Sequence, residues 1–265
     1  MSHSQVWRRA QEYAAHIPHP IQRLRNELKN ASLILVLDAT HLRIRGKGYF
    51  VHIAYDTHLG PIHFAVDDSE NATAYSVMLN MLEKEGYKPI AVVSDGHWGI
   101  RTAVKDWNLP QQRCVFHLLQ DLRRMLVTHG ELKGANKVLY SRLKGIWKAK
   151  TIEALADRVN QFRKIVFCFR RKKQLGELRD FWEGLHEATL HLSFKPGEVP
   201  RTSNILENLN GQIKARTKTM RGVKSKASLI NLLKILFYFR SLKGHTQVYA
   251  TVPRRNRRHD RCHMG

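Results

Sequence analysis

Two short apolar runs, each followed directly by an aspartate, constrain the fold of this chain more than any other feature. Residues 33–38 read Leu-Ile-Leu-Val-Leu-Asp, and residues 90–95 read Ile-Ala-Val-Val-Ser-Asp. Runs of this length that are rich in β-branched residues are typical of buried strands. If each aspartate ends its strand, both carboxylates lie at the edge of a sheet, where a divalent cation can reach them. The pattern therefore predicts an α/β core with an acidic site.

A strong positive charge narrows the class of partner. The 265 residues include 45 Lys or Arg and 22 Asp or Glu, for a formal net charge of +23. Such a field attracts polyanions, and nucleic acid is the commonest large one in a cell. No apolar run is long enough to span a bilayer, the N-terminus lacks a secretory signal, and three scattered cysteines fit a reducing compartment. We therefore expect a cytoplasmic, DNA-associated protein with no membrane partner.

The order of patterns up to residue 117 predicts three strands, a helix, a strand, a helix and a last short strand. The expected strands are 33–38, 49–56, 61–67, 90–95 and 113–117, and the expected helices are 72–85, capped by Asn71, and 97–107. This order matches the ribonuclease-H-like arrangement, in which an antiparallel trio of strands joins a parallel pair. The order of strands within the sheet rests on the family resemblance given below.

The remainder of the chain is mostly helical in pattern. Residues 118–190 have apolar residues at helical spacing and few turn signals, and helices are expected at 202–218 and 228–240. The basic run at 170–173 is either a solvated face or a DNA contact. Residues 2–10 have a Ser cap and two outward arginines, so they form either the second helix of a helix-turn-helix unit or an ordinary amphipathic leader helix.

A third carboxylate lies in an otherwise basic stretch. Residues 201–265 contain fifteen Lys or Arg but only two acids, one of which is Glu207. Asn204, Glu207 and Asn210 recur at i, i+3 and i+6, which places them along one side of a helix. An acid kept where phosphate must approach favours a metal-binding role.

Clustered carboxylates of this kind suit phosphodiester chemistry. Two Mg²⁺ (or Mn²⁺) ions about 3.5–4 Å apart can stabilise the nucleophile and the leaving oxygen together. We expect Asp38 to bridge the two ions, Asp95 to hold one from the side, and Glu207 to complete the metal site. Taken singly, each residue has a simpler explanation, since an Asp after a strand is often a turn former and Glu207 could pair with Arg201 or Lys214.

Four sequence blocks, taken in order, carry a family resemblance. They are Leu37-Asp38-Ala39-Thr40, Val93-Ser94-Asp95-Gly96-His97-Trp98-Gly99-Ile100, Gln112-Arg113-Cys114-Val115-Phe116-His117, and Thr202-Ser203-Asn204-Ile205-Leu206-Glu207-Asn208-Leu209-Asn210 running into Lys214-Ala215-Arg216-Thr217-Lys218. Through these blocks, over roughly residues 33–235, the chain resembles the mutator-type transposases of bacterial insertion sequences, a branch of the Asp-Asp-Glu transposase and integrase superfamily.

The resemblance implies a fold, a site and partners. It implies that Asp38, Asp95 and Glu207 are the catalytic and metal-binding triad of a ribonuclease-H-like mixed sheet, with an all-helical insertion before the final catalytic helix. It also implies a homodimer or higher oligomer on double-stranded DNA, at element ends and target. The expected segments are a partial helix-turn-helix-like segment (1–30), the first part of the core (31–118), the helical insertion (119–197), the catalytic helix and C-terminal part of the core (198–245), and a basic tail (246–265).

The Cys114-x-x-His117 block has two readings. It is half of a plausible zinc site, but no second ligand pair follows at zinc-finger spacing. His186 and His191 are candidate partners that nothing in the sequence ties to this pair. The resemblance favours a structural or DNA-positioning feature near the active site.

Basic residues around Glu207 are the expected phosphate contacts, which would position DNA rather than read its bases. They are Arg201, Lys214, Arg216, Lys218, Arg221 and Lys224. Two further accessory candidates are His97, which would pack at a helix start or position water or a base, and Asn204.

Together these features predict a DNA transposase catalytic domain. Water would free a 3′-hydroxyl at the end of the element, and that hydroxyl would then attack target DNA. The alternatives are a catalytically silent DNA-binding remnant of a transposase and a ribonuclease-H-like nuclease. The complete set of three carboxylates counts against the first alternative, and the long helical insertion counts against the second.

Overall fold

The fold is that of a computed structural model, which describes residues 2–28, 32–127, 131–166, 185, 187–219 and 222–247. Several sequence predictions fall outside these residues and are not placed. They concern Arg221, Cys168, His186, Cys262, the basic run at 170–173 and the tail beyond residue 247.

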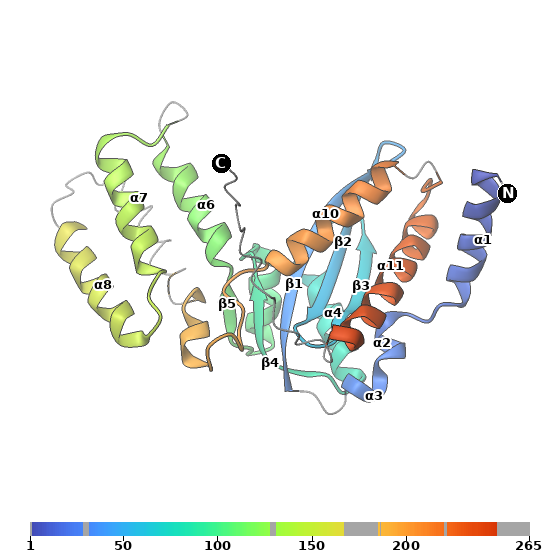
Figure 1. Ribbon diagram of the computed structural model, residues 1–265, viewed down its shortest axis with the longest axis horizontal. Helices are drawn as coiled ribbons and strands as arrows, with labels where there is room; N and C mark the ends of the chain where they lie inside the picture. Colours follow the sequence, from blue (N-terminus) through green and yellow to red (C-terminus); the bar gives the residue numbers. More distant parts are fainter. Residues whose placement is uncertain are drawn as a thin grey trace, which may run out of the picture.

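A five-stranded mixed sheet forms the centre of the molecule (Figure 1). The strands β1 (Ser32–Ile44), β2 (Lys47–Asp56) and β3 (Gly60–Asp67) pair in antiparallel fashion, whereas β4 (Lys88–Ser94) runs parallel to β1 and β5 (Gln111–Arg113) runs parallel to β4. The strand order is β3-β2-β1-β4-β5, with β1 in the middle. This order confirms the ribonuclease-H-like arrangement expected from the sequence.

Two predicted strand boundaries are wrong. β1 does not end at Asp38 but continues to Ile44, because its second half pairs with β2 up to Lys47. Its parallel partner β4 does end at this level, where Ser94 pairs with Leu37. The strand expected at 113–117 is instead the end of β5 at Arg113 followed by the start of a helix at Val115.

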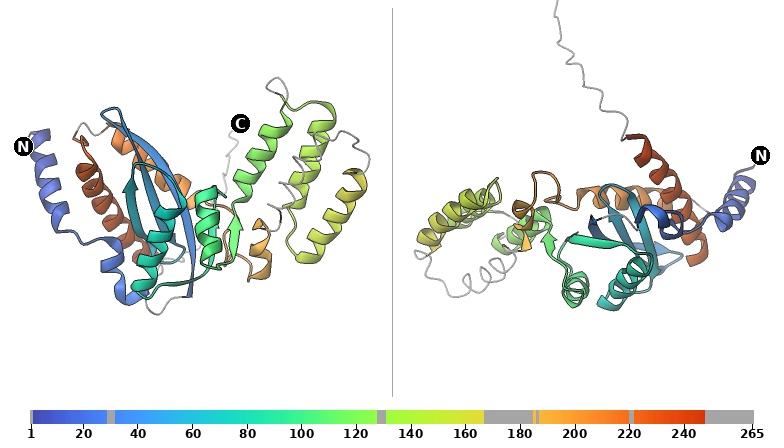
Figure 2. Two further views of the ribbon diagram at one scale, coloured as in Figure 1. Left: turned by 180° about the vertical axis from the view of Figure 1, so that it is seen from behind. Right: turned by 90° about the horizontal axis from the view of Figure 1, so that it is seen from below.

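Helices cover both faces of the sheet (Figures 1 and 2). The helices α10 (Asn204–Thr219) and α11 (Lys226–Gln247) lie on one face, and α4 (Ala72–Lys84) and α5 (Trp98–Asp106) lie on the other. Each face has its own apolar core, one including Val36, Leu206 and Phe237 and the other including Leu37 and Tyr75. Burial on both faces explains why β1 and β4 are almost continuously apolar.

The N-terminal helix α1 (His3–His16) packs against α11. Ser2 caps it with a capping box, as the sequence predicted, and the amide of Asn231 donates a 3.0 Å hydrogen bond to Gln11 Oε1. Two four-residue helices, α2 (Pro20–Arg23) and α3 (Arg25–Leu28), then lead to β1. The helix-turn-helix assignment of this segment stays a prediction.

A helical lobe stands beside the sheet. The helices α6 (Val115–Leu126), α7 (Gly134–Ile146) and α8 (Ile152–Val166) share an apolar core that includes Leu122, Leu143 and Phe162 (Figure 1). A short 3₁₀ helix, η1 (Leu190–Ser193), returns the chain to β5. The boundaries of the predicted insertion remain a prediction. None of the helices in the described ranges is long and apolar enough to cross a membrane.

Two histidines whose rings contact at a tilt join α2 to the edge of the sheet. His19, which caps α2, donates from Nε2 to the carbonyl oxygen of Phe64 at 3.0 Å, and its ring centroid lies 4.6 Å from that of His63. The His63 side chain is buried. Burial lowers the pKa of His63 to about 3 and that of His19 to about 4, so both rings are neutral in the folded protein near pH 7.

We expect this pair to make the fold sensitive to mild acid. A histidine whose folded pKa is lowered stabilises the fold above its unfolded pKa, near 6.5, and that stability is lost as the pH falls below it. At pH 5 the loss is on the order of 2 kcal/mol for His63. His63→Gln should therefore lose less unfolding free energy between pH 7 and pH 5 than wild type, as measured by urea denaturation. The exposed His58→Gln should keep the wild-type pH dependence; equal curves for all three proteins would contradict the expectation.

Candidate functional site

Asp38 and Asp95 meet because their strands are parallel neighbours that are in register. Leu37 pairs with Ser94, so the next residue on each chain lies at the same level of the sheet. Asp95 leaves β4 in a turn at Gly96, whose φ of +91° favours glycine. An added Cβ there would lie 2.5 Å from Arg113 Nε, so the arginine side chain would have to shift. The structure thus brings together two of the three predicted carboxylates.

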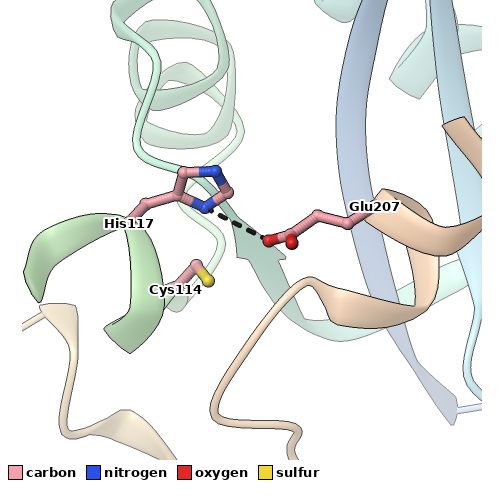
Figure 3. Close-up of side chains that lie close together, drawn as sticks. All are labelled: Cys114, His117 and Glu207. Atoms are coloured by element: carbon pink, nitrogen blue, oxygen red, sulfur yellow. Dashed lines mark ion pairs between the residues drawn. The ribbon is translucent and has the colours of Figure 1, made fainter. Parts of the chain in front are cut away.

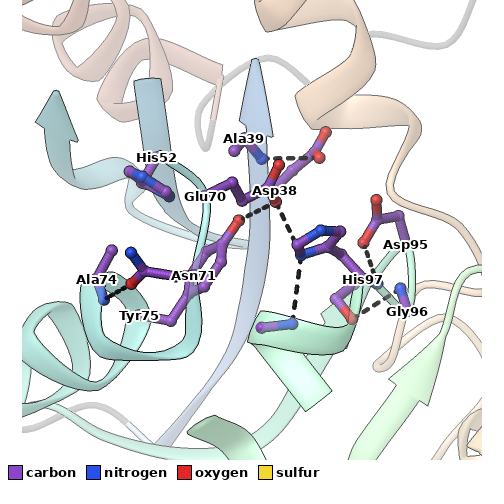
Figure 4. Close-up of polar contacts among 12 residues, drawn as sticks. Asp38, Ala39, His52, Glu70, Asn71, Ala74, Tyr75, Asp95, Gly96 and His97 are labelled. Carbon is purple, nitrogen blue, oxygen red and sulfur yellow. Dashed lines mark hydrogen bonds and ion pairs between the residues drawn. The ribbon is translucent and has the colours of Figure 1, made fainter. Parts of the chain in front are cut away.

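The Asp38 carboxylate is buried and held by two hydrogen bonds. Asp38 is 8% exposed, and its Oδ1 accepts from the Ala39 backbone N–H at 2.8 Å (Figure 4). Its Oδ2 accepts from Asn210 Nδ2 at 2.8 Å. Asp95 is less enclosed, and its Oδ1 accepts from the His97 N–H at 2.8 Å. Asn210 is a site residue that the sequence did not identify as such, although its spacing from Glu207 placed it on the correct side of its helix.

The charge state of Asp38 reflects this environment. Burial, together with the negative charge of Asp95, raises the pKa of Asp38 to about 7, against the opposing hydrogen bond from Ala39. The charge of Glu70 raises it further. Near neutral pH this cluster of acids therefore favours either a proton or a cation.

Glu70 is a fourth acid at the site, and the sequence did not reveal it. Its Oε1 accepts a 2.7 Å hydrogen bond from the Tyr75 hydroxyl and lies 3.3 Å from His97 Nδ1 (Figure 4). His97 caps α5, as its position predicted, with Nδ1 also 3.3 Å from the Gly99 N–H. A single acid before a helix cap has no distinctive pattern, so only the three-dimensional structure identifies Glu70.

Glu207 lies in the first turns of α10 and faces α6. Its Oε1 is 3.7 Å from His117 Nδ1, and its side chain is 34% exposed (Figure 3). The potential metal-ligand atoms of Cys114, His117 and Glu207 all lie within 4.8 Å of one another. Among the described residues, these three side chains form the cluster of His, Cys, Asp or Glu that is spaced closely enough to hold a metal ion. Asp38 and Asp95 are not members of it. The third predicted carboxylate is thus turned toward the Cys-x-x-His block.

The Cys-x-x-His block joins the end of β4 to the start of α10. The Cys114 N–H donates to the Ser94 carbonyl at 2.7 Å, and its Sγ accepts from the Ser203 N–H at 3.3 Å. The Val115 N–H donates to the Arg201 carbonyl at 3.0 Å. These bonds fix the entry to the Glu207 helix, so Ser203 is another positioning residue that the sequence did not single out.

Hydrogen bonds at the Cys114 sulfur also shift the pKa values of Cys114 and His117. Hydrogen bonding to the Cys114 sulfur raises the pKa of His117 to about 9. Burial alone would raise the pKa of Cys114, but the hydrogen bonds from His117 and Ser203 outweigh it and lower the pKa. Near pH 7 the block therefore presents an imidazolium to Glu207.

The predicted phosphate contacts that the structure describes are exposed side chains. No ion pair joins them to an acid within the described part of the chain. Helical periodicity places Lys214 and Lys218 on the same face of α10 as Glu207, seven and eleven residues further on. Arg216, nine residues after Glu207, lies on the opposite face of the helix. The remaining members of the set are Arg201 and Lys224, and the accessory candidate Asn204 is exposed at the first position of α10.

We expect Asp38→Asn to stabilise the protein at pH 8. A carboxyl whose folded pKa is raised from 3.8 to about 7 costs stability as the pH rises between these values, by up to about 4 kcal/mol. An amide removes this cost and can still pair with Asn210. Thermal unfolding should therefore show a higher Tm for the variant at pH 8 and a smaller difference at pH 4.5. The exposed Asp106→Asn is the matched control; a variant less stable than wild type at pH 8 would contradict the expectation.

Comparison with known proteins places this geometry in a family. Similar solved structures include the HTLV-2 integrase catalytic core domain in complex with magnesium (dimeric form; 17% identity, 40% of this chain and 80% of that chain, TM-score 0.27) and the Drosophila P element transposase strand transfer complex (13% identity, 93% and 74%, TM-score 0.33). No curated protein matches the sequence. Residues 17–241 match the description "Transposase, Mutator family". Because this match covers most of the chain, the protein belongs to the Mutator family of transposases.

Proposed function

We propose that the chain is the metal-dependent catalytic part of a DNA transposase, with Asp38, Asp95 and Glu207 as its catalytic carboxylates. The observation that carries this proposal is the pair of aspartates on adjacent parallel strands, one of them buried at 8% exposure. Membership of the Mutator family supports the transposase role. The bond from Asn210 to Asp38 supports a role for Glu207 in the same site, because Asn210 lies one turn from Glu207 on α10.

The residues present fit a divalent cation. The donor set consists of carboxylate oxygens, which Mg²⁺ and Mn²⁺ prefer. Burial and the negative charge of Asp95 together raise the pKa of Asp38 to about 7, and a cation would offset both effects. When bound, two such ions would activate the attacking oxygen and stabilise the leaving oxygen of a phosphodiester.

The surrounding residues position the carboxylates. Asn210 fixes one oxygen of Asp38, and the His97 N–H fixes one oxygen of Asp95. Neither aspartate then needs to change its side-chain rotamer to present its remaining lone pairs, which is the preorganisation that phosphoryl transfer requires. In the reaction, water attacks the phosphodiester at the element end and a 3′-hydroxyl leaves. That hydroxyl attacks target DNA in the second step and displaces another 3′-oxygen.

The face of α10 that carries Glu207 offers a path for DNA. Gly211 lies between Glu207 and Lys214 on this face, it is exposed, and an added Cβ would meet no atom within 4 Å. A glycine inside a helix costs about 1 kcal/mol relative to alanine, and no packing in the described structure requires it here. A smooth surface between an acid and two lysines lets a phosphate backbone approach closely. We infer that Lys214 and Lys218 contact phosphates along this path.

Other parts of the proposal follow from the family. The partner is double-stranded DNA at the element ends and the target, and a homodimer or higher oligomer would hold two ends together. The predicted insertion at 119–197 would stand beside this DNA, and the protein would act on the DNA of a bacterial cell. The alternatives remain a DNA-binding remnant without catalysis and a ribonuclease-H-like nuclease.

We expect Asp38→Asn, Asp95→Asn and Glu207→Gln each to reduce DNA cleavage and strand transfer roughly 1,000-fold. Losing a metal ligand removes several kcal/mol of transition-state stabilisation. The assay uses labelled DNA with candidate element ends and Mg²⁺ or Mn²⁺, and DNA binding is measured in parallel.

The control for this assay is Glu198→Gln, which changes an exposed acid a few residues before α10. It should cut and join DNA like wild type. Intact protein that binds DNA but never cuts it would favour the remnant. Cleavage of RNA–DNA hybrids without strand transfer would favour the nuclease, and activity in Glu207→Gln would remove that residue from the catalytic set.

We expect Lys214→Gln and Lys218→Gln to weaken DNA binding by loss of phosphate contacts. Each contact contributes about 0.9 to the slope of log Kd against log salt concentration for duplex DNA, so each variant should flatten the slope by roughly that amount. Fluorescence anisotropy over a range of salt concentrations measures it. Lys84→Gln, exposed on α4 on the opposite face of the sheet, is the control. Equal slopes for all four proteins would place the DNA path elsewhere.

A further inference from the structure

Sulfur, nitrogen and oxygen ligands converge beside the catalytic aspartates. The Cys114 Sγ, a His117 ring nitrogen and a Glu207 carboxylate oxygen lie within 4.8 Å of one another (Figure 3). They come from two helices, α6 and α10, which are far apart in sequence. The sequence contained only the Cys-x-x-His half of such a site, and the structure supplies Glu207 as a third ligand.

The polar atoms that face each other in this cluster lack hydrogen bonds. His117 Nδ1 and Glu207 Oε1 are both buried atoms with no hydrogen-bond partner, and they lie 3.7 Å apart. Buried polar atoms normally form hydrogen bonds, and the 3.7 Å ion pair between these two is too long to be one. A cation shared by the two atoms would satisfy both at once. This observation is independent of the ligand types and points to the same conclusion.

The spacing suits a small tetrahedral ion. Zinc binds sulfur at about 2.3 Å and nitrogen or oxygen at about 2.0–2.2 Å, so its ligand atoms lie about 3.3–3.7 Å apart. The observed distance of 3.7 Å between His117 and Glu207 already matches, and the Cys114 sulfur is within 4.8 Å of both. Thiolate ligands select zinc, cobalt or cadmium over Mg²⁺. The hard ions of the proposed catalytic reaction would therefore not compete well here.

The ligands are also held in place by their surroundings. The Ser203 N–H donates to the Cys114 sulfur, and the bond from the Val115 N–H to the Arg201 carbonyl ties the two helix starts together. Outer contacts of this kind orient metal ligands and limit their movement. Cys114 is fully buried, so the ion would bind at the inner end of the cluster with His117 and Glu207 closing it.

We propose that Cys114, His117 and Glu207 bind one thiophilic divalent cation, such as Zn²⁺, and that this cation withholds Glu207 from Asp38 and Asp95. Binding requires loss of the protons on sulfur and nitrogen, which pass to solvent. The ion then holds the Glu207 carboxylate on the α6 side of the site. The first half of the proposal concerns metal binding alone, whereas the second half rests on the proposed catalytic role of Glu207.

Cobalt titration of the intact, chelator-treated protein tests the binding half without any DNA. One equivalent of Co²⁺ should produce a sulfur-to-cobalt charge-transfer band and the strong visible bands of tetrahedral cobalt, and Zn²⁺ should remove them. Cys114→Ser should lose the charge-transfer band. Glu207→Gln, a change on the helix surface, should keep the band and bind Co²⁺ at least about tenfold more weakly.

The other two cysteines provide the matched control. The double variant Cys168→Ser, Cys262→Ser should retain the cobalt spectrum of wild type. No charge-transfer band in wild type with excess Co²⁺, or a band that survives in Cys114→Ser and disappears in the double variant, overturns the binding site. Unchanged Co²⁺ affinity in Glu207→Gln would show that Glu207 is not a ligand of the metal site. This variant tests the site even if Cys114→Ser fails to fold.

A cleavage assay tests the second half separately. With saturating Mg²⁺, one equivalent of Zn²⁺ should reduce wild-type cleavage at least tenfold, and a chelator specific for zinc should restore it. Zn²⁺ should leave the rate of Cys114→Ser, whatever its basal value, within about twofold. Equal inhibition of both proteins overturns the withholding of Glu207. If wild type never cuts DNA, the proposed function fails while the cobalt result still decides the binding site.

Discussion

The hydrogen bond from the Asn210 amide to the Asp38 carboxylate is the contact on which the arrangement of the site depends. It connects the central strand of the sheet to α10, with 2.8 Å between Asn210 Nδ2 and Asp38 Oδ2. A carboxylate that is 8% exposed cannot rely on water, so it needs such a donor to be tolerated in the core. The same helix carries Glu207 one turn away. The burial of the first acid and the placement of the third are therefore secured together.

This arrangement is unfavourable by itself, and that property is useful. Asp38 is buried and lies near the negative charges of Asp95 and Glu70, and these effects, burial foremost, raise its pKa to about 7. The fold tolerates this repulsion because the apolar cores on both faces of the sheet are extensive. A cation that binds in the site would relieve this repulsion, and the relief would contribute to its binding free energy. Stability sacrificed at a site in this way is a common accompaniment of function.

Sequence patterns predicted elements well where the signal was local. The hairpin at 49–67 and the Asn71 cap follow from turn residues and spacing within a few positions. The continuation of β1 through residues 39–44 was missed, because it depends on pairing with β2 rather than on its own apolar content. The bond from Asn210 to Asp38 spans 172 residues, so spacing could place Asn210 on a helix face but not against a particular strand. Glu70 belongs to no motif and acquires its role only from its neighbours.

The long separation between β1 and α10 has a consequence for synthesis. The sheet strands emerge from the ribosome before α10, because Asn210 lies 172 residues after Asp38. Asn210 and Glu207 become available only once α10 has emerged. Until then Asp38 has no amide donor from α10, and the buried end of β1 lacks its covering helix. The three predicted acids therefore cannot take their folded positions until α10 has been synthesised. The contacts that order the candidate site thus form later than the sheet strands that lead to Asp38 and Asp95.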